Sequence, residues 1–292
     1  CRPLAELGTV ADYIPALATV PPDRYAIAVS RLDGDEPSVG DADVPLSLQS
    51  ISKVFALTLA MQKIDNVEEL WCRVGREPSG TSFNSLVQLE SERGIPRNPL
   101  INAGAIVVAD HLRTVCEDPR QELLELVTDL AGSEVDVDGD VWASERDHGS
   151  RNRAIANLMA SFGNLTHPVE EVLDDYFRQC SLRMTPAQLA RSMRFLANDG
   201  VDPGTGRAVL TPEKSRRVAA LLLTCGTYDA AGEFAFEVGI PCKSGVGGAI
   251  VGIVPDQLAV CVWSPPLDAR SNSLAGTATL TRLAARAGFS VF

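Results

Sequence analysis

Strand-like patterns lie near both ends of this 292-residue chain, and helix-like patterns fill the middle. An alternating apolar run at residues 25–29 predicts a strand, and residues 249–254 and 258–263 predict two strands of a hairpin. Between residue 50 and about residue 218, the spacing of apolar residues favours helices. Because strands need partners, we expect the two ends to meet in one antiparallel sheet, with a helical lobe inserted between them.

Further elements follow from local signals. Thr185 and Thr211, each followed by a proline, predict helix starts, and a helix at 271–287 should end at Gly288. We also expect a helical segment near 13–18 and a strand at 233–238. The prediction is one α/β domain over residues 1–292, with an α/β lobe from 1–49 and 219–292 and a helical lobe from 50–218.

Composition excludes several kinds of partner. Hydrophobic residues make up 45% of the chain and charged residues 22%, as in folded globular proteins. The net charge of −12 makes a poor match for nucleic acid phosphates or anionic lipid, so neither nucleic acid nor membrane is expected as a partner. The longest apolar runs, such as 103–109, are far shorter than the ~20 residues that a membrane span needs.

Seven cysteines are scattered along the chain, with no C-x-x-C pair. An odd, dispersed set indicates neither a disulfide framework nor a zinc site, so we expect a cytoplasmic protein. The three histidines do not stand at ligand spacing on one helix face, and no metal is expected.

The shortest motif with chemical meaning is Ser50-Ile51-Ser52-Lys53. On a helix, Ser50 and Lys53 share one face, and the apolar residues that follow predict a buried helix. A lysine packed among apolar neighbours loses its proton more readily and can act as a base for the serine. Spacing alone leaves the ordinary reading open, because a helical serine and lysine in this register usually form a solvated pair.

A second motif, Lys243-Ser244-Gly245, stands just ahead of the strand predicted at 249–254. It matches the K-[ST]-G element of penicillin-recognising acyl-transfer enzymes, in the expected order after S-x-x-K. The nearby glycines allow backbone N–H groups to approach a ligand, although the segment is also compatible with an ordinary turn. The serine-aspartate-asparagine element of that class is missing, which argues against a β-lactamase or peptidase.

A longer resemblance covers nearly the whole chain in collinear order. The matching segments are residues 49–55, 83–85, 98–106, 144–146, 151–152, 175–177, 180–181, 225–229, 243–248 and 263–268. In these segments the chain resembles the serine-dependent glutaminases, which share the penicillin-recognising, β-lactamase-like fold and hydrolyse the side-chain amide of L-glutamine. The resemblance implies an α/β fold with an antiparallel sheet flanked by helices.

The resemblance also implies roles for individual residues. The nucleophile falls on Ser50, its lysine partner on Lys53, and a proton carrier near the serine on Tyr228. Backbone N–H groups of Ser50 and Val246 correspond to the oxyanion donors. The family's substrate contacts fall on Tyr13, Ser50, Asn102, Glu145, Asn152, Tyr176, Tyr228 and Val246. The family commonly forms dimers or tetramers, so a homo-oligomer is expected, and no cofactor is implied.

These residue types suit L-glutamine. A buried Glu145 can pair the substrate ammonium, and the asparagines and tyrosines can hydrogen-bond its carboxylate without adding a second full charge. Attack by Ser50 would release ammonia and leave a γ-glutamyl ester, which water then cleaves to glutamate. Without the family pattern, core packing would explain the tyrosines, and capping or solvation would explain the asparagines and the glutamate.

Alternative functions remain at this stage. One alternative is a serine enzyme that acts on another amide, of asparagine or β-lactam type. Another is a relative that binds an amino acid without turning it over. An assay of ammonia release separates the binding protein from the enzyme. Residues 134–145 also follow an EF-hand calcium loop, with Gly139 in sixth place and Glu145 in twelfth. Glutamate rather than aspartate in first place and the lack of a second copy argue against calcium, which a calorimetric titration would test.

Overall fold

The computed structural model describes residues 1–80 and 85–292. Phe83 and Asn84, part of one matching segment, lie outside these residues. The α-helices are α1 Ser52–Lys63, α2 Glu68–Trp71, α3 Leu86–Ser91, α4 Asn102–Val115, α5 Pro119–Ala131, α6 Gly139–His148, α7 Ser150–Ser161, α8 Val169–Cys180, α9 Pro186–Ser192, α10 Arg194–Ala197, α11 Pro212–Cys225, α12 Ala231–Glu237 and α13 Leu274–Ala287. Short 3₁₀ helices are η1 Arg2–Leu7, η2 Leu17–Thr19, η3 Gln49–Ile51 and η4 Tyr228–Ala230. The strands are β1 Ala26–Arg31, β2 Ser38–Gly40, β3 Leu46–Ser47, β4 Asp136–Val137, β5 Leu182–Met184, β6 Cys242–Ser244, β7 Ala249–Val254 and β8 Leu258–Trp263.

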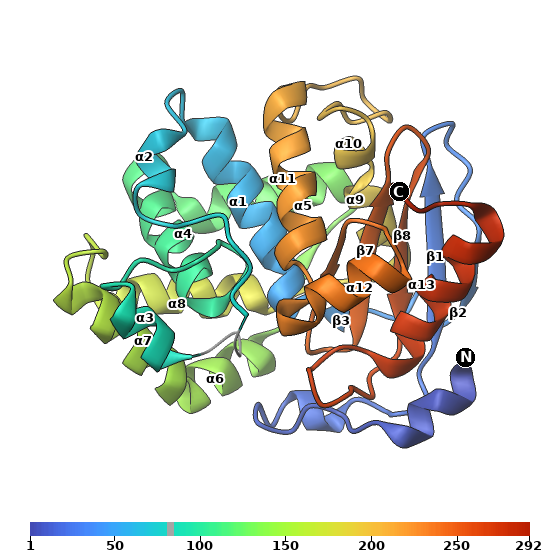
Figure 1. Ribbon diagram of the computed structural model, residues 1–292, viewed down its shortest axis with the longest axis horizontal. Helices are drawn as coiled ribbons and strands as arrows, with labels where there is room; N and C mark the ends of the chain where they lie inside the picture. Colours follow the sequence, from blue (N-terminus) through green and yellow to red (C-terminus); the bar gives the residue numbers. More distant parts are fainter. Residues whose placement is uncertain (81–84) are drawn as a thin grey trace.

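The two ends of the chain meet in one antiparallel sheet, as the sequence predicts. Its strand order is β2-β1-β8-β7-β6, and β1 pairs with β8 along its whole length, from Ala26 opposite Trp263 to Arg31 opposite Leu258. Strands β7 and β8 have the predicted bounds and are buried at every position. Figure 1 shows the sheet at the right, with the blue N-terminal strand beside the red C-terminal ones.

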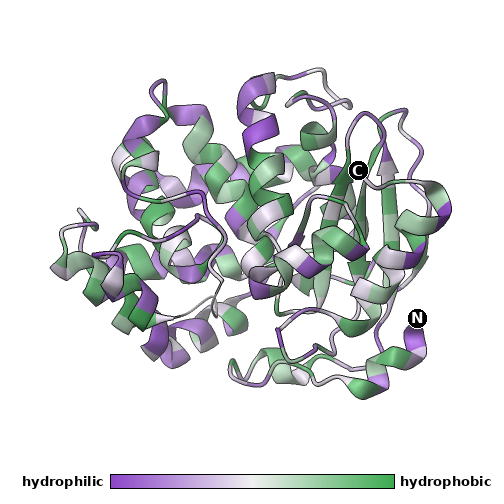
Figure 2. Ribbon diagram, in the orientation of Figure 1, coloured by the Kyte–Doolittle hydropathy of each residue, from purple (hydrophilic) through white to green (hydrophobic). Residues whose placement is uncertain are grey.

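Helices cover both faces of this sheet. One face packs on α13 and α12 through a cluster that includes Phe234, Val260 and Leu280. The other face belongs to the main core, in which Val251 and Cys261 pack with residues of α1, α4, α8 and α9. Figure 2 shows the central strands of the sheet mostly in hydrophobic green, whereas the outer helices mix green with purple. A sheet buried on both sides explains why its central strands read as continuous apolar runs.

The strand predicted at 233–238 is wrong, because these residues form α12. The segment alternates apolar and polar residues, but its buried side chains follow helical spacing, from Ala231 to Phe234 and Val238. Phe236, which the strand pattern would bury with them, is 88% exposed. Packing against the sheet therefore decides for the helix.

One other prediction needs correction. The helix expected near 13–18 is only the 3₁₀ turn η2, preceded by turn residues.

The middle of the chain is mostly helical, as predicted. It also contains β4 and β5, which form a small antiparallel sheet with β3. The predicted caps are confirmed: Thr185 forms a capping box with Gln188, Thr211 caps α11, and Gly288 ends α13 with φ of +68°. Within residues 1–80 and 85–292, no helix is long and apolar enough to cross a membrane.

Candidate active site

Ser50 lies in the short 3₁₀ turn η3, directly ahead of α1. The residue before it, Gln49, has φ of +50°, a left-handed conformation that is unfavourable for a side chain other than glycine. This turn places Ser50 at the start of the helix and not inside it. At this end of a helix the dipole favours negative charge. Ser50 is 8% exposed and lines a cavity.

Lys53 is buried one turn further along α1, with 1% of its surface exposed. Its Nζ donates a hydrogen bond of 2.7 Å to Oδ1 of Asn102, the first residue of α4. Asn102 in turn donates through Nδ2 to Oδ1 of Asn152 on α7, at 3.0 Å. Burial lowers the pKa of Lys53 to about 8, only partly opposed by electrostatic interactions with Cys180 and Glu145. A lysine with this pKa can accept a proton near neutral pH.

Tyr228 is the second side chain that contacts the candidate nucleophile Ser50. The two side chains share a hydrogen bond, and the Tyr228 hydroxyl also donates to the Ser244 carbonyl at 3.2 Å. Burial raises the pKa of Tyr228 to about 12, so the hydroxyl keeps its proton and can pass one on. Like Gln49, Tyr228 has a left-handed backbone, with φ of +60°.

Lys243, the lysine of the K-S-G motif, packs against the ring of Tyr228. Its fully buried Nζ lies 4.3 Å from the centre of the Tyr228 ring and donates to the carbonyls of Gly226, at 2.9 Å, and Ser244, at 2.6 Å. Burial lowers the pKa of Lys243, and the charge of Lys53 lowers it further. At the end of this motif, a Cβ on Gly245 would lie 2.8 Å from the Leu48 carbonyl oxygen. The motif therefore approaches the turn that holds Ser50 as closely as glycine allows.

Glu145 is a buried carboxylate on α6, with 5% of its surface exposed. Gln49 hydrogen-bonds its side chain, and among the described residues Glu145 forms no ion pair. Burial raises the pKa of Glu145 to about 7, against the opposing effects of Gln49 and Lys53. A buried carboxylate in this state gains most from a cation that enters with a ligand.

A cavity of about 320 Å³ lies beside Ser50, among the N-terminal segment, η3 and helices α4, α6, α7 and α8. Tyr13, Ser50, Asn102, Glu145, Asn152 and Tyr176 line it. Tyr13 is the most exposed of these predicted residues, at 55%, and lies in the N-terminal segment. That segment is tied to α6 by a hydrogen bond of 3.3 Å from the Ala16 N–H to the Ser144 hydroxyl. The structure therefore brings six of the predicted site residues to one cavity.

The other three predicted residues, Lys53, Tyr228 and Val246, do not line the cavity themselves. Lys53 and Tyr228 are connected to it by hydrogen bonds to Asn102 and Ser50, which line it. Val246 lies in the turn between β6 and β7 and packs in a cluster with Ile14 and Val141. Within the described part of the chain, the backbone N–H of Val246 donates no hydrogen bond.

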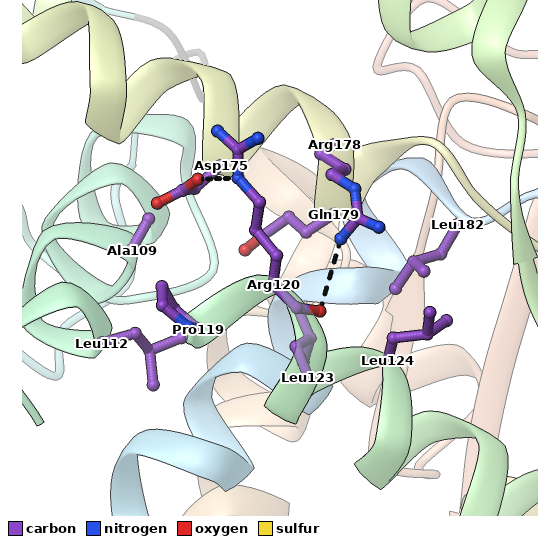
Figure 3. A pocket seen from close by; sticks show the side chains of 10 residues that line it. All are labelled: Ala109, Leu112, Pro119, Arg120, Leu123, Leu124, Asp175, Arg178, Gln179 and Leu182. Atoms are coloured by element: carbon purple, nitrogen blue, oxygen red, sulfur yellow. Dashed lines mark hydrogen bonds and ion pairs between the residues drawn. The ribbon is translucent and has the colours of Figure 1, made fainter. Parts of the chain in front are cut away.

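A second pocket differs in size and chemistry. It has about 20 Å³ and lies among α4, α5 and α8, lined by apolar residues together with Arg120, Asp175 and Gln179 (Figure 3). This space holds about one water molecule. It is too small for an amino acid. The cavity beside Ser50 is the candidate active site because six of the predicted residues line it.

The acidic segment 134–145 does not form the loop of an EF-hand. Asp136 lies on β4 and pairs with Arg183 at 2.8 Å, and Asp138 caps α6 by accepting from the backbone N–H groups of Asp140 and Val141. Helix α6 already begins at Gly139, the sixth position of the proposed loop, and carries Glu145 to the cavity. Among residues 1–80 and 85–292, no cluster of three or more histidine, cysteine or acidic side chains is arranged to hold a metal ion.

Comparison with known proteins agrees with this geometry. The family model described as Glutaminase matches residues 8–292. The chain belongs to the glutaminase family. A Glutaminase of Vibrio parahaemolyticus is 54% identical over 292 residues, covering 100% of this chain and 95% of that protein.

Solved structures of glutaminases share the fold. The probable glutaminase YbaS aligns with a TM-score of 0.93 at 36% identity, covering 100% of this chain and 97% of that one. A probable glutaminase from Bacillus subtilis, complexed with 6-diazo-5-oxo-L-norleucine, aligns with a TM-score of 0.90 at 32% identity, over 100% and 92%. The fold is thus the β-lactamase-like α/β fold that the sequence predicts, and the protein is an amidohydrolase that converts glutamine to glutamate.

Sequence reasoning missed several residues of this glutaminase site. Gln49 stands at the start of the matching segment 49–55, and the sequence gives no signal of its hydrogen bond with Glu145. Lys243 was recognised as part of K-S-G but given no role. Arg151 and Cys180 also line the cavity. Nothing in the local sequence distinguishes these two from surface or core residues.

Proposed function

We propose that this glutaminase works through a γ-glutamyl ester on Ser50, with Lys53 and Tyr228 moving the protons. The observation that carries the proposal is the position of Ser50, which hydrogen-bonds Tyr228 and lies one helical turn before a buried lysine of lowered pKa. Neutral Lys53 takes the serine proton while the serine oxygen attacks the amide carbon. Tyr228 delivers a proton to the departing nitrogen, so that ammonia leaves.

Substrate recognition follows from the charges around the cavity. Glu145 pairs the α-ammonium group, which is the one full positive charge of glutamine. Tyr13, Asn102, Asn152 and Tyr176 hydrogen-bond the α-carboxylate. These contacts hold the amide carbon beside Ser50, where the N–H groups of Ser50 and Val246 stabilise the oxyanion.

The ester is then hydrolysed along the same path. Water enters the position left by ammonia, and the Tyr228 oxygen, which gave its proton to ammonia, takes a proton from this water as it attacks the ester carbon. Lys53 then returns to Ser50 the proton that it took in the first step, and glutamate leaves. Every step uses side chains of this chain and water, so the proposal needs no cofactor.

Mass spectrometry of the intact protein tests this proposal. Rapid acid quenching during turnover of L-glutamine should show a population heavier by one glutamyl group, and peptide mapping should place the group on Ser50. The compound 6-diazo-5-oxo-L-norleucine, found with the Bacillus subtilis relative, should label the same serine. Ser161→Ala, an exposed serine on α7, is the control and should label normally. Labelling that persists in Ser50→Ala would refute the role of Ser50.

We further propose that residues 1–292 form a single catalytic domain, which works as a homo-oligomer in the cytoplasm. Pairing of β1 with β8 supports the single domain, since the sheet needs both ends of the chain. All seven cysteines lie in the described residues and none forms a disulfide, which suits a reducing compartment. Light scattering at several protein concentrations tests the oligomer.

A further inference from the structure

A cluster of charged residues lies behind the substrate cavity and joins four helices. We call Arg113, Arg120, Trp142, Asp174 and Asp175 the arginine–aspartate cluster. They come from α4, α5, α6 and α8 respectively, with both aspartates on α8. Figure 3 shows Arg120 reaching Asp175 across the small pocket between α5 and α8.

Arg120 contacts three other members of this cluster. Its Nη2 donates to Asp174 Oδ2 at 2.7 Å, and its Nε donates to Asp175 Oδ1. Its guanidinium also lies 5.9 Å from the centre of the Trp142 ring. One planar side chain on α5 therefore binds two consecutive residues of α8 and stacks on α6, which a lysine at this position cannot do.

Two further hydrogen bonds close the cluster. Trp142 donates through Nε1 to Asp174 Oδ1 at 3.0 Å, which joins α6 to α8 directly. Arg113 donates through Nη1 to Asp175 Oδ2 at 2.6 Å, which joins α4 to α8. Both oxygens of each aspartate are thus occupied. The Asp175 side chain is only 8% exposed, so water screens these contacts less than it screens pairs on the surface.

The joined helices carry the residues that face the substrate. Helix α6 bears Glu145 three residues after Trp142, on the same side of the helix. Helix α8 bears Tyr176 directly after Asp175, and α4 begins with Asn102. A change in the spacing of α6 and α8 therefore changes the distance from Glu145 to Tyr176.

We infer that the arginine–aspartate cluster positions Glu145 and Tyr176 for the two ends of the amino acid, with Arg120 as its principal positioning residue. The inference rests on the substrate contacts proposed above. It makes Arg120 a determinant of substrate affinity without any contact with substrate. A cluster that only stabilised the fold would lower the melting temperature and leave KM unchanged.

The experiment compares Arg120, which belongs to α5, with Arg207, which pairs with a residue of α5. Arg120→Met keeps most of the side-chain stem and removes the fork. Arg207→Met is the matched control, because Arg207 pairs at 2.5 Å with Asp129 near the other end of α5, in an exposed pair that touches neither α6 nor α8. For each variant, KM and kcat for L-glutamine are measured alongside the melting temperature.

We expect Arg120→Met to raise KM about tenfold, since small misplacements of substrate-holding groups have large effects, and to change kcat less than about twofold. Arg207→Met should leave both constants unchanged. Arg120→Lys, which keeps the charge but pairs with only one aspartate, should recover only part of the loss. An unchanged KM in folded Arg120→Met, or an equal rise in Arg207→Met, would overturn the inference.

Two further variants keep the result interpretable. Should Arg120→Met fail to fold, Asp174→Asn serves in its place, because it keeps the shape and weakens the bonds to Arg120 and Trp142; an unchanged KM there would equally overturn the inference. Glu145→Gln separates the inference from the proposed function. An unchanged KM in Glu145→Gln, with a raised KM in the cluster variants, would contradict the proposed contact between Glu145 and substrate. A raised KM in Glu145→Gln, with an unchanged KM in the cluster variants, would contradict only the role of the cluster.

Discussion

Lys53 Nζ and Asn102 Oδ1 lie 2.7 Å apart, next to the cavity that Asn102 and Ser50 line. Lys53 is thus hydrogen-bonded to a neutral amide oxygen and forms no ion pair within the described residues. A carboxylate in that place would hold the lysine in its charged form, whereas an amide accepts from either form. This contact orients Lys53 and leaves burial to lower its pKa.

Removal of either member of the Ser50–Lys53 pair should abolish ammonia release. We expect Ser50→Ala and Lys53→Ala each to lower kcat by about 10⁴-fold or more, and the double variant to be little worse, because residues that act as one unit are not additive. Ammonia release and circular dichroism would be measured on all three. Wild-type turnover by a folded Ser50→Ala protein would exclude the acyl-serine mechanism.

Activity should rise with pH between about 6 and 9. Lys53, with a pKa of about 8, must lose its proton to act as a base, and Glu145, with a pKa of about 7, must lose its proton to pair the ammonium. Both ionisations therefore act in the same direction on kcat/KM. The Glu145→Gln variant should lose the dependence near pH 7 and keep the one near pH 8. A profile of kcat/KM that falls over this range would contradict both assignments.

The buried lysine should lower stability. The unfolded chain binds a proton at Lys53 up to about pH 10.5, whereas the folded chain releases it near pH 8. Wild-type stability therefore rises with pH across this window, and below pH 8 the cost is complete, at about 3 kcal/mol. After loss of the Asn102 hydrogen bond, worth about 1 kcal/mol, Lys53→Met should be more stable by about 2 kcal/mol at pH 7.

Urea denaturation at several pH values measures this difference in the free energy of unfolding. The advantage of Lys53→Met should shrink as pH rises from 8 toward 10. Lys63→Met is the control, because Lys63 is a partly exposed lysine at the other end of α1 that pairs with Glu122. An advantage that does not change with pH would show that Lys53 is not the cause.

The Tyr228 hydroxyl can be tested separately from its ring. Tyr228→Phe keeps the ring against Lys243, whose Nζ lies 4.3 Å from the ring centre, and removes the hydroxyl that hydrogen-bonds Ser50. We expect kcat to fall by about 10²–10⁴-fold, as for loss of a general acid or base, with KM changed much less. Rapid-quench measurement of the first turnover should show that ester formation is slowed. A normal first turnover would assign Tyr228 a purely structural role.

The strands of the sheet were easier to predict from the sequence than the helices that pack on the sheet. Strands β7 and β8 are continuous apolar runs, and their burial on both faces makes that pattern unambiguous. The segment that forms α12 fits both a strand and a helix, and only its packing through Phe234 and Val238 settles the choice. Such contacts join parts of the chain that no local pattern connects.

At the site, the motifs predicted which residues gather but not how they are held. The left-handed backbone at Gln49 and Tyr228 has no local signal, since neither is glycine, and it depends on the surrounding packing. The hydrogen bond between Gln49 and Glu145 joins η3 to α6, which no local pattern connects, and it was therefore not predicted. The same holds for the arginine–aspartate cluster, whose members come from four helices.

The last prediction concerns the charge of Glu145. Glu145→Gln keeps the shape of the side chain and removes the carboxylate that we expect to hold the substrate ammonium. We expect kcat/KM for L-glutamine to fall by an amount equivalent to about 2–5 kcal/mol, as for the loss of one partner of a desolvated charge pair. Steady-state kinetics over a range of L-glutamine concentrations measures this change.

A glutamine analogue without the α-amino group identifies the partner of that charge. In wild type the analogue leaves a buried carboxylate without its cation, which is costly because Glu145 is only 5% exposed. In Glu145→Gln no charge is left unpaired. The loss of kcat/KM on removing the amino group should therefore be much larger in wild type than in the variant. Equal losses in the two enzymes would show that Glu145 does not bind the ammonium, and that its raised pKa serves some other interaction in the cavity.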